Sequence, residues 1–316
     1  SQPSLRGLFP EHPPYLGRLM VSCSIVIPTH NRDDLLVRAV RSALKSCPTV
    51  GEVLVVDDKS LIPAAQVLTG ETDPRLRVIV NTGQKGAAST RNLGVSSARG
   101  DVVFFLDDDD VILPGYCERI LAPGGPVSQA DWGFSSVLIR QQGQSSDTLL
   151  QRKRLCRGVA PVKARVRDSV AATSDGFWIR KVRFDQVGGF DPEQTIDEDT
   201  DLCVRLLGLG HRPWYEPEPG MLIYRGFAPA RVGGAQLTTA TPISKGLMCY
   251  RRTYDKNADR FGLYSVMRWF LVTRYLRRAV KAGRVDVARD FVRSQAPWMW
   301  SRMLAVYVIL KRFKHS

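Results

Sequence analysis

Four consecutive aspartates, Asp107 to Asp110, directly follow an apolar run over residues 102–106. The run is short and rich in Val and Phe, so it predicts a buried strand. Carboxylates presented together where a strand leaves a sheet raise each other's pKa unless a cation lies between them. Hard oxygen ligands of this kind suit Mg²⁺ or Mn²⁺. The feature favours a metal site at the edge of an α/β sheet, with a solvated acidic turn as the alternative.

Short apolar segments alternate with helical patterns through the first part of the chain. Asn31 or Asp33 is expected to cap the first helix. Because strands and helices alternate, βαβ units and a parallel sheet are predicted, with the acidic and Pro-containing loops on one edge. The predicted strands cover 22–27, 52–56, 76–80 and 102–106, and a helix is expected over 87–98.

The remainder of the chain divides at breaker-rich segments. The Pro and Gly cluster at 122–126 predicts a seam, and residues 226–245, rich in Gly, Ala, Pro and Thr, predict a mobile loop. Further strands are expected over 132–140, 147–155 and 176–179, and a helix over 199–207. We therefore expect four segments: an extended arm (1–21), two halves of one α/β unit (22–125 and 126–230), and a loop followed by basic amphipathic helices (231–316).

Positive charge is concentrated at the end of the chain. The net charge is +14, and residues 251–316 hold 16 Lys or Arg and four Asp, a net of +12. Two interpretations stay open: a helical subdomain packed on the core, or a basic surface on anionic lipid with Trp269, Trp298 and Trp300 at the interface. No recognisable nucleic-acid-binding module accompanies the charge, so nucleic acid is not expected as a partner.

The six cysteines form no C-x-x-C pair, which argues against a zinc site or a disulfide framework and fits a reducing compartment. The N-terminal residues lack the charged-then-apolar layout of a signal peptide. No apolar stretch reaches the roughly 18 to 20 residues that a spanning helix needs. These features predict a cytoplasmic protein, with peripheral binding at the inner face of the cell membrane if the basic tail contacts lipid.

Four motifs occur in an order that resembles glycosyltransferase family 2, the inverting sugar transferases of the GT-A fold. They are Ile27–Arg32 (IPTHNR), Val55–Ser60 (VVDDKS), Gly86–Gly94 (GAASTRNLG) before the aspartate run, and Gly188–Asp191 (GGFD) before Glu198-Asp199. The resemblance covers roughly residues 22–225. It implies a Rossmann-like mixed sheet flanked by helices, to which this chain adds a basic helical C-terminal extension. The halves 22–125 and 126–230 would then bind the nucleotide sugar and the acceptor.

The resemblance also implies roles for individual residues. The nucleotide would be bound by Pro28, Thr29, Asn31, Asp57, Asp58, Arg91, Asp107 and Asp108, and the metal by Asp109 with Asp107. Asp57 corresponds to the acid that hydrogen-bonds the base, and Arg91 to a basic residue near the diphosphate. The alternatives are that Asp57 and Asp58 cap the loop after a buried strand and that Arg91 forms a surface salt bridge.

Asp199 corresponds to the family's general base, which takes the proton of the acceptor hydroxyl while the metal neutralises the departing diphosphate. The alternative is that Glu198 and Asp199 favour a helix N-terminus through its dipole. Many members carry a His after the last core strand; here Met221–Arg225 has none, so Arg225 is expected near the phosphates. Glu198 and Trp178, the latter with Trp132 and Phe134, are expected near the acceptor.

The sequence thus predicts an inverting glycosyltransferase that uses Mn²⁺ or Mg²⁺. A UDP-sugar is the expected donor, and a saccharide, lipid-linked and in cell-surface polysaccharide synthesis, the expected acceptor. A soluble acceptor and a sugar- or membrane-binding protein without catalysis stay open as alternatives. A sugar-nucleotide pyrophosphorylase is disfavoured, because that class expects a Gly-rich basic loop after the first strand, and Pro28-Thr29-His30-Asn31 stands there.

Overall fold

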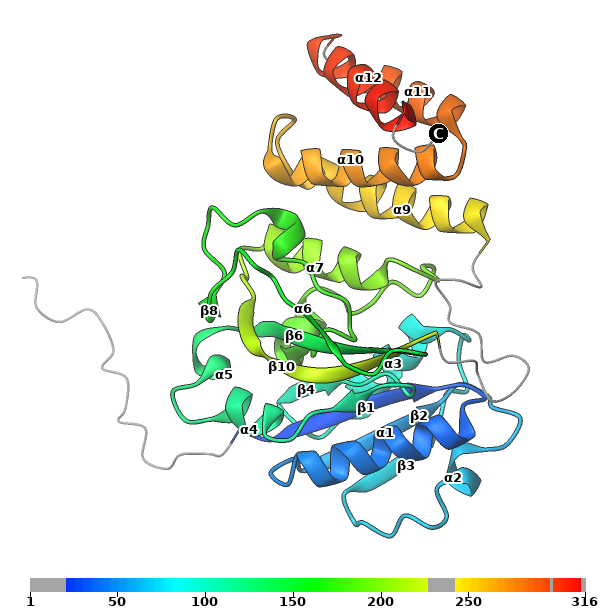
Figure 1. Cartoon of the computed structure of the whole chain (residues 1–316), viewed down its shortest axis with the longest axis vertical. Coiled ribbons are helices and arrows are strands. Elements are labelled where there is room, and N and C mark those ends of the chain that lie inside the picture. The colour runs from blue at the N-terminus through cyan, green and yellow to red at the C-terminus, as the bar shows by residue number, and fades with distance from the viewer. Residues whose placement is uncertain (1–20, 227–241, 296–297, 314–316) are drawn as a thin grey trace, which may run out of the picture.

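The computed structural model describes residues 21–226, 242–295 and 298–313 (Figure 1). Most of the predicted N-terminal arm and of the predicted mobile loop lies outside the described residues. The strands are β1 Cys23–Thr29, β2 Glu52–Asp57, β3 Leu76–Val80, β4 Val102–Phe105, β5 Val111–Ile112, β6 Trp132–Gln141, β7 Thr148–Leu150, β8 Gly158–Val159, β9 Trp178–Arg180 and β10 Trp214–Arg225.

Helices lie on both faces of the sheet and beyond one end of it (Figure 1). Those before residue 226 are α1 Asp33–Ser46, α2 Ala64–Val67, α3 Ala87–Ser97, α4 Tyr116–Leu121, α5 Pro126–Gln129, the 3-10 turn η1 Val166–Asp168, α6 Lys181–Gln186 and α7 Glu198–Gly208. The later ones are α9 Ile243–Asn257, the 3-10 turn η2 Ala258–Arg260, α10 Val266–Lys281, α11 Val285–Ser294 and α12 Trp298–Phe313.

The described strands form one ten-stranded mixed sheet in the order β3-β2-β1-β4-β9-β6-β10-β5, with β7 beside β6 and β8 beside β10. β1 is parallel to β2 and to β4, and β2 is parallel to β3. β9 runs antiparallel between β4 and β6, and β10 is parallel to β6. Both halves of the chain therefore contribute to one sheet, which confirms the expected mixed α/β architecture.

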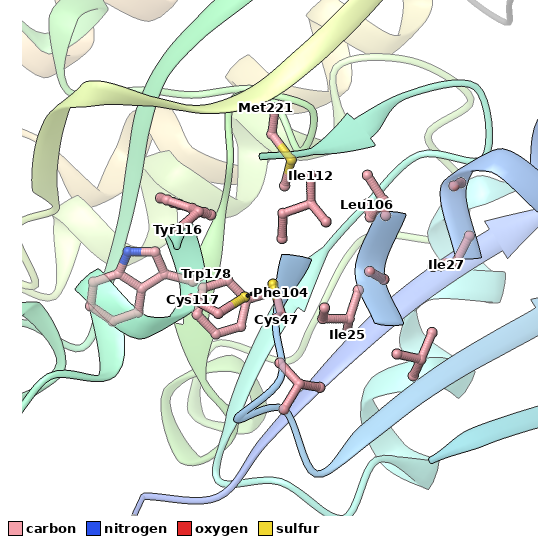
Figure 2. Packing of buried hydrophobic residues seen from close by; sticks show 14 of the residues in the cluster. Ile25, Ile27, Cys47, Phe104, Leu106, Ile112, Tyr116, Cys117, Trp178 and Met221 are labelled. Carbon is pink, nitrogen blue, oxygen red and sulfur yellow. Dashed lines mark hydrogen bonds between the residues drawn. The ribbon is translucent and has the colours of Figure 1, made fainter. Parts of the chain in front are cut away.

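Alternation along the strands builds two apolar layers. Ile25 and Ile27 point to the layer under α1, with Phe104 of β4 (Figure 2), whereas Val26 and Phe105 point to the layer under α3 and α7. Successive side chains of a strand point to opposite faces, so a strand covered on both faces needs a continuous apolar run. The runs that predicted β1, β2 and β4 are therefore runs of residues buried on both sides.

Gly94 allows α3 to pack close against the sheet. A Cβ at this position would lie 2.4 Å from Cγ1 of Val26 and 3.2 Å from Cγ2 of Val56. A contact as short as 2.4 Å essentially never occurs at a real Cβ, so a larger side chain would push the helix off β1 and β2. Because α3 also carries Arg91, this glycine fixes how deep that guanidinium lies at the edge of the sheet.

Some local predictions are corrected by the structure. The residue at the N-cap position of α1 is Arg32, whose side chain makes no capping hydrogen bond, so neither Asn31 nor Asp33 occupies the expected cap position. Asn31 instead has φ 56° and accepts a hydrogen bond from the Leu61 N–H at 2.8 Å. The strand expected over 147–155 is limited to β7, an exposed three-residue strand beside β6.

The C-terminal helices pack on the α/β unit through a third apolar cluster. Val204 of α7 belongs to this cluster together with Leu247 of α9 and Leu276 of α10, and Figure 1 shows α9 and α10 stacked beyond α7. Trp300 is 6% exposed and its ring lies 5.1 Å from that of Trp269. The expected helical subdomain is thus present and packed on the core, and these two indoles are used in that packing.

Among the residues described, no helix combines the length and the apolar character required to cross a bilayer.

Candidate functional site

The sheet brings three of the sequence motifs to one edge. β1, β2 and β4 are parallel neighbours, and Thr29 pairs with Asp57 at the last register positions of β1 and β2. The loops that follow these strands therefore emerge side by side, at the carboxyl ends where open α/β sheets bind ligands. This places Pro28, Thr29 and Asn31 beside Asp57 and Asp58, and places both groups beside the aspartate run.

Asp57 and Asp58 hold the neighbouring loops in place. Asp57 accepts hydrogen bonds from the backbone N–H groups of Ser60 and Ala64, at 2.9 and 2.8 Å. Asp58 accepts from the Asn81 amide at 2.8 Å and from the Gly86 N–H at 2.9 Å. Both side chains are buried. They shape the surface on which a nucleotide would lie, and Asp58 connects it to the start of α3.

The four aspartates have four different environments. Asp107 accepts a hydrogen bond from Arg91 at 2.8 Å, and Asp109 pairs with Arg32 at 3.0 Å. Asp110 is buried and accepts the Tyr224 N–H at 3.2 Å. Burial, followed by the charge of Asp109, raises the pKa of Asp108 to about 7. Asp107 and Asp109 are thus the partly exposed pair, at 27% and 22% for their side chains, that could reach a ligand.

Arg91 joins the aspartate run to the Glu198-Asp199 motif. Its Nη2 donates to Asp107 at 2.8 Å, and its Nη1 donates to Glu198 at 2.9 Å. Burial lowers the pKa of the guanidinium, but Asp107 and Glu198 raise it by more, so Arg91 remains charged. The surface-salt-bridge alternative for Arg91 is wrong, because its side chain is only 7% exposed. Sequence reasoning found each of these residues but not the bridge between them.

Asp199 lies in the first turn of α7 with a raised pKa. Burial, and then the negative charges of Glu198 and Asp197, raise the pKa of Asp199 to about 7. One of its oxygens accepts the Thr200 N–H at 2.6 Å. A half-buried carboxylate whose pKa lies near neutrality is suited to accept a proton from a weakly acidic hydroxyl. The first-turn position also fits the helix-dipole interpretation, and the two roles are compatible.

The C-terminal helices contact the other side of this motif, which the sequence did not indicate. Arg274 of α10 pairs with Asp197 and donates to the Thr200 hydroxyl at 2.8 Å. Thr253 of α9 donates to Asp197 at 2.8 Å. Asp197 itself has φ 71°, a left-handed conformation that is uncommon for a residue other than glycine. The backbone that presents Asp199 is therefore held by side chains of α9 and α10.

The residues at the sheet edge fit a divalent cation completed by substrate. In the described part of the chain, no group of three His, Cys, Asp or Glu side chains could hold a metal ion by itself. Asp107 and Asp109 each use one oxygen for an arginine, which leaves a second oxygen on each. Mg²⁺ is commonly bound by one or two carboxylates together with phosphate oxygens and water, so this donor set is adequate.

The expected aromatic acceptor surface is corrected. Trp178, Trp132 and Phe134 are each 0% exposed and belong to the apolar layers of the sheet. Their rings fill the core around β6 and β9 and present no face to a glycan. Arg225 is exposed at the end of β10. The pKa of Asp175 is raised by burial, and the charge of Arg225 reduces that rise. It has no described contact with Asp107, Asp109 or Arg91.

The chain resembles glycosyltransferases of known sequence. Residues 24–123 match the family described as Glycosyl transferase family 2. An uncharacterized glycosyltransferase of Haemophilus influenzae is 35% identical over 255 residues, which cover 75% of this chain and 78% of that protein. The succinoglycan biosynthesis protein ExoO of Rhizobium meliloti is 27% identical over 67% of this chain, and the match spans 63% of its own length.

The fold resembles that of a solved structure. The crystal structure of S. aureus TarS 1-349 in complex with UDP-GlcNAc superposes with a TM-score of 0.68 at 16% identity, covering 93% of this chain and 89% of the other. At this identity the similarity concerns the fold, and it extends over the C-terminal helices as well as the sheet.

The raised pKa of Asp199 leads to a prediction about stability. In the unfolded chain this carboxyl titrates near its usual value of about 3.9, whereas in the folded protein its pKa is about 7. The negative charge therefore costs folding free energy as pH rises through this interval. Asp199→Asn should raise the melting temperature more at pH 8 than at pH 4.5. Asp290→Asn, at a side chain that is 76% exposed, is the control and should show no such difference. An equal effect of Asp199→Asn at both pH values would contradict the prediction.

Proposed function

The chain belongs to glycosyltransferase family 2 and has its GT-A fold, and we propose that it moves a sugar from a nucleoside diphosphate donor to a saccharide hydroxyl with inversion. The observation that carries this proposal is the Arg91 bridge from Asp107 to Glu198. It holds the acids on the donor side and the carboxylate pair on the acceptor side in one cluster. A displacement reaction needs its leaving group and its base to be kept in such proximity.

Asp199 acts as the general base. As the acceptor oxygen bonds to the anomeric carbon, its proton passes to the Asp199 carboxylate, and the bond from that carbon to the diphosphate oxygen breaks. The nucleoside diphosphate leaves with the bonding electrons. One base and one departing group give a single displacement, so a second carboxylate nucleophile is not required. Burial, and then the charges of Glu198 and Asp197, keep the Asp199 pKa high enough for it to take a proton.

Mn²⁺ or Mg²⁺ would be held by Asp109 and Asp107, with the remaining ligands from the diphosphate and water. When bound, the cation would neutralise charge on the leaving diphosphate. Arg32 and Arg91, which pair with these two carboxylates, lie where they can also approach phosphate oxygens. Asp108 is buried beside them and would belong to the part of the aspartate run that borders the ribose.

A UDP-sugar is the donor that we favour. The S. aureus TarS structure was solved with UDP-GlcNAc, which supports a uridine nucleotide at the equivalent edge of this sheet. Pro28, Thr29 and Asn31 lie across from Asp57 and would border the base and ribose. Because both Asp57 oxygens already accept backbone N–H groups, a base N–H would have to share one of them.

A saccharide destined for a cell-surface polysaccharide is the acceptor that we favour. The relative from Rhizobium meliloti is named for succinoglycan biosynthesis, which supports a polysaccharide pathway. A lipid-linked acceptor would place the protein peripherally at the inner face of the membrane. On α12, Met303, Val306 and Leu310 recur at helical spacing with exposed fractions of 55%, 56% and 62%. These apolar side chains, together with the net charge of +12 on residues 251–316, suit an anionic lipid surface.

Replacing the base tests the mechanism. We expect Asp199→Asn to keep donor binding and to lower the transfer rate by at least about a hundredfold, the lower end for loss of a general base. Transfer is measured by release of nucleoside diphosphate in the presence of acceptor, with Asp290→Asn as the control. Turnover near that of the wild type would mean that another residue takes the proton.

Replacing the second exposed aspartate tests the metal assignment. We expect Asp109→Ala to weaken UDP binding in the presence of Mn²⁺ while leaving the weak binding without metal unchanged, as measured by calorimetry. Asp290→Ala is the matched control at an exposed position. Equal Mn²⁺-dependent affinity in Asp109→Ala and wild type would refute the role of Asp109.

Substitutions on α12 test the membrane contact. Removing residues 251–316 would uncover Val204 of α7, so point substitutions are preferable. We expect Val306→Ser with Leu310→Ser to reduce co-sedimentation with phosphatidylglycerol vesicles, and little binding of either protein to phosphatidylcholine alone. Val162→Ser, at a side chain that is 85% exposed elsewhere, is the control. Unchanged sedimentation of the double variant would exclude α12 as the contact.

A further inference from the structure

A basic pocket lies between the η1 turn and helices α9 and α10. Its volume is about 610 Å³, within the range of roughly 300 to 1,000 Å³ that small-molecule sites occupy. Six of its lining residues are cationic: Arg165, Arg167, Arg274, Arg277, Arg278 and Lys281. None of the described residues that line it is acidic. The cavity, which we call the α10 pocket, therefore combines the size of a ligand site with a marked excess of positive charge.

The α10 pocket also has apolar and aromatic walls, formed by Tyr250, Val266, Trp269 and Phe270. The Arg274 and Arg278 guanidinium carbons lie 4.7 and 5.5 Å from the centre of the Tyr250 ring. The Nε and Nη2 groups of Arg274 already bond to Asp197 and Thr200, whereas Arg278, held against the same aromatic face, can present its N–H fork to an anion. Walls of this kind bind a molecule that carries both a negative group and an apolar or sugar surface.

One cation of the pocket is incompletely bonded within the protein. Arg278 is half-buried, and its Nε–H is buried without a hydrogen-bond partner in the described part of the chain. An unpaired buried donor costs free energy, which a bound anion would recover. Asp168 lies 3.6 Å from Arg167 and Asp197 pairs with Arg274, so two of the six charges have carboxylate partners and an excess remains.

The α10 pocket adjoins the catalytic carboxylate. Arg274, which lines it, contacts Asp197 and Thr200, the residues on either side of Glu198 and Asp199. Arg91 contacts Glu198 and Asp107 from the opposite, donor side. The carboxylate pair is thus bracketed by two arginines. One belongs to the nucleotide edge of the sheet and the other to the wall of the pocket.

We propose that the α10 pocket binds a phosphate or diphosphate group of the acceptor and so directs the acceptor hydroxyl toward Asp199. The proposal rests on the proposed function, because it concerns the acceptor of that reaction. Arginine side chains match phosphate oxygens with paired N–H donors, and the aromatic wall covers the sugar or apolar part next to the phosphate. The acceptor is therefore a phosphorylated glycan carrier rather than a neutral oligosaccharide.

Direct binding tests the pocket without requiring turnover. Saturating UDP and Mn²⁺ occupy the donor site, and binding is followed by Trp fluorescence, since Trp269 lines the pocket. Farnesyl diphosphate represents a lipid-linked source of the phosphate and glucose 1-phosphate a soluble one, with farnesol and glucose as their phosphate-free counterparts. We expect at least one phosphorylated probe to bind and its counterpart not to bind. The probe that binds identifies the source.

Matched variants locate the binding. Arg278→Gln, and separately the exposed Lys281→Gln, should weaken the phosphorylated probe by about tenfold, which corresponds to 1.4 kcal/mol. Arg289→Gln, an exposed residue of α11 outside the pocket, should leave its affinity unchanged. If Arg278→Gln lowers the melting temperature, its weaker binding could reflect unfolding, and the exposed Lys281→Gln then provides the test.

Several results would overturn the proposal: no binding of either phosphorylated probe, competition by UDP, or equal affinity in Lys281→Gln and wild type. Binding only to phosphatidylglycerol vesicles, unaffected by these variants, would assign the charge to a membrane surface instead. Failure of the proposed function can be told apart from failure of the pocket proposal. It would appear as an absence of Mn²⁺-dependent UDP binding to the wild-type protein.

Discussion

The double ion pair of Arg91 is the interaction on which the arrangement of the site depends. Its guanidinium is buried, so it requires carboxylates on both sides to offset the loss of water. Asp107 comes from the end of β4 and Glu198 from the start of α7, which are far apart in sequence. Gly94, one helical turn further along α3, permits the close approach that places this guanidinium between them. A single buried cation thus joins the aspartate run after β4 to the Glu198-Asp199 motif of α7.

The acidic first turn of α7 needs further cations, and the C-terminal helices supply them. Asp197 pairs with Arg274, and Asp201 pairs with both Arg205 and Lys256. Part of the positive charge of the C-terminal region is therefore used inside the protein, where it compensates acids at the start of α7. Among the described residues, no cation forms an ion pair with Asp199, and its pKa stays high. Stability is therefore lost at Asp199, the residue that we propose as the general base, and such a loss is common at functional sites.

The strands and the main motifs could be predicted from the sequence because their signal is local. Runs such as Ile25–Ile27 and Phe104–Leu106 are buried on both faces, so their composition alone indicates a central strand. An aromatic residue by itself does not indicate whether it lies in the core or at a binding surface. Trp178 was expected at a glycan and lies in the core, since β9 inserts between β4 and β6 and both its faces are covered. Antiparallel insertion of a short strand leaves no pattern in the sequence.

The α/β class, the acidic loops at the strand ends and the match to the family's motifs could all be predicted from local sequence, because each is a property of a few neighbouring residues. The folded chain was needed to show which acids remain exposed, which are paired with arginine, and that Asp197 is held by an arginine 77 residues away. It also decided that the basic tail forms a pocket wall beside Asp199. Charge compensation and burial depend on contacts across the fold, and a linear chain of residues does not encode them in any local pattern.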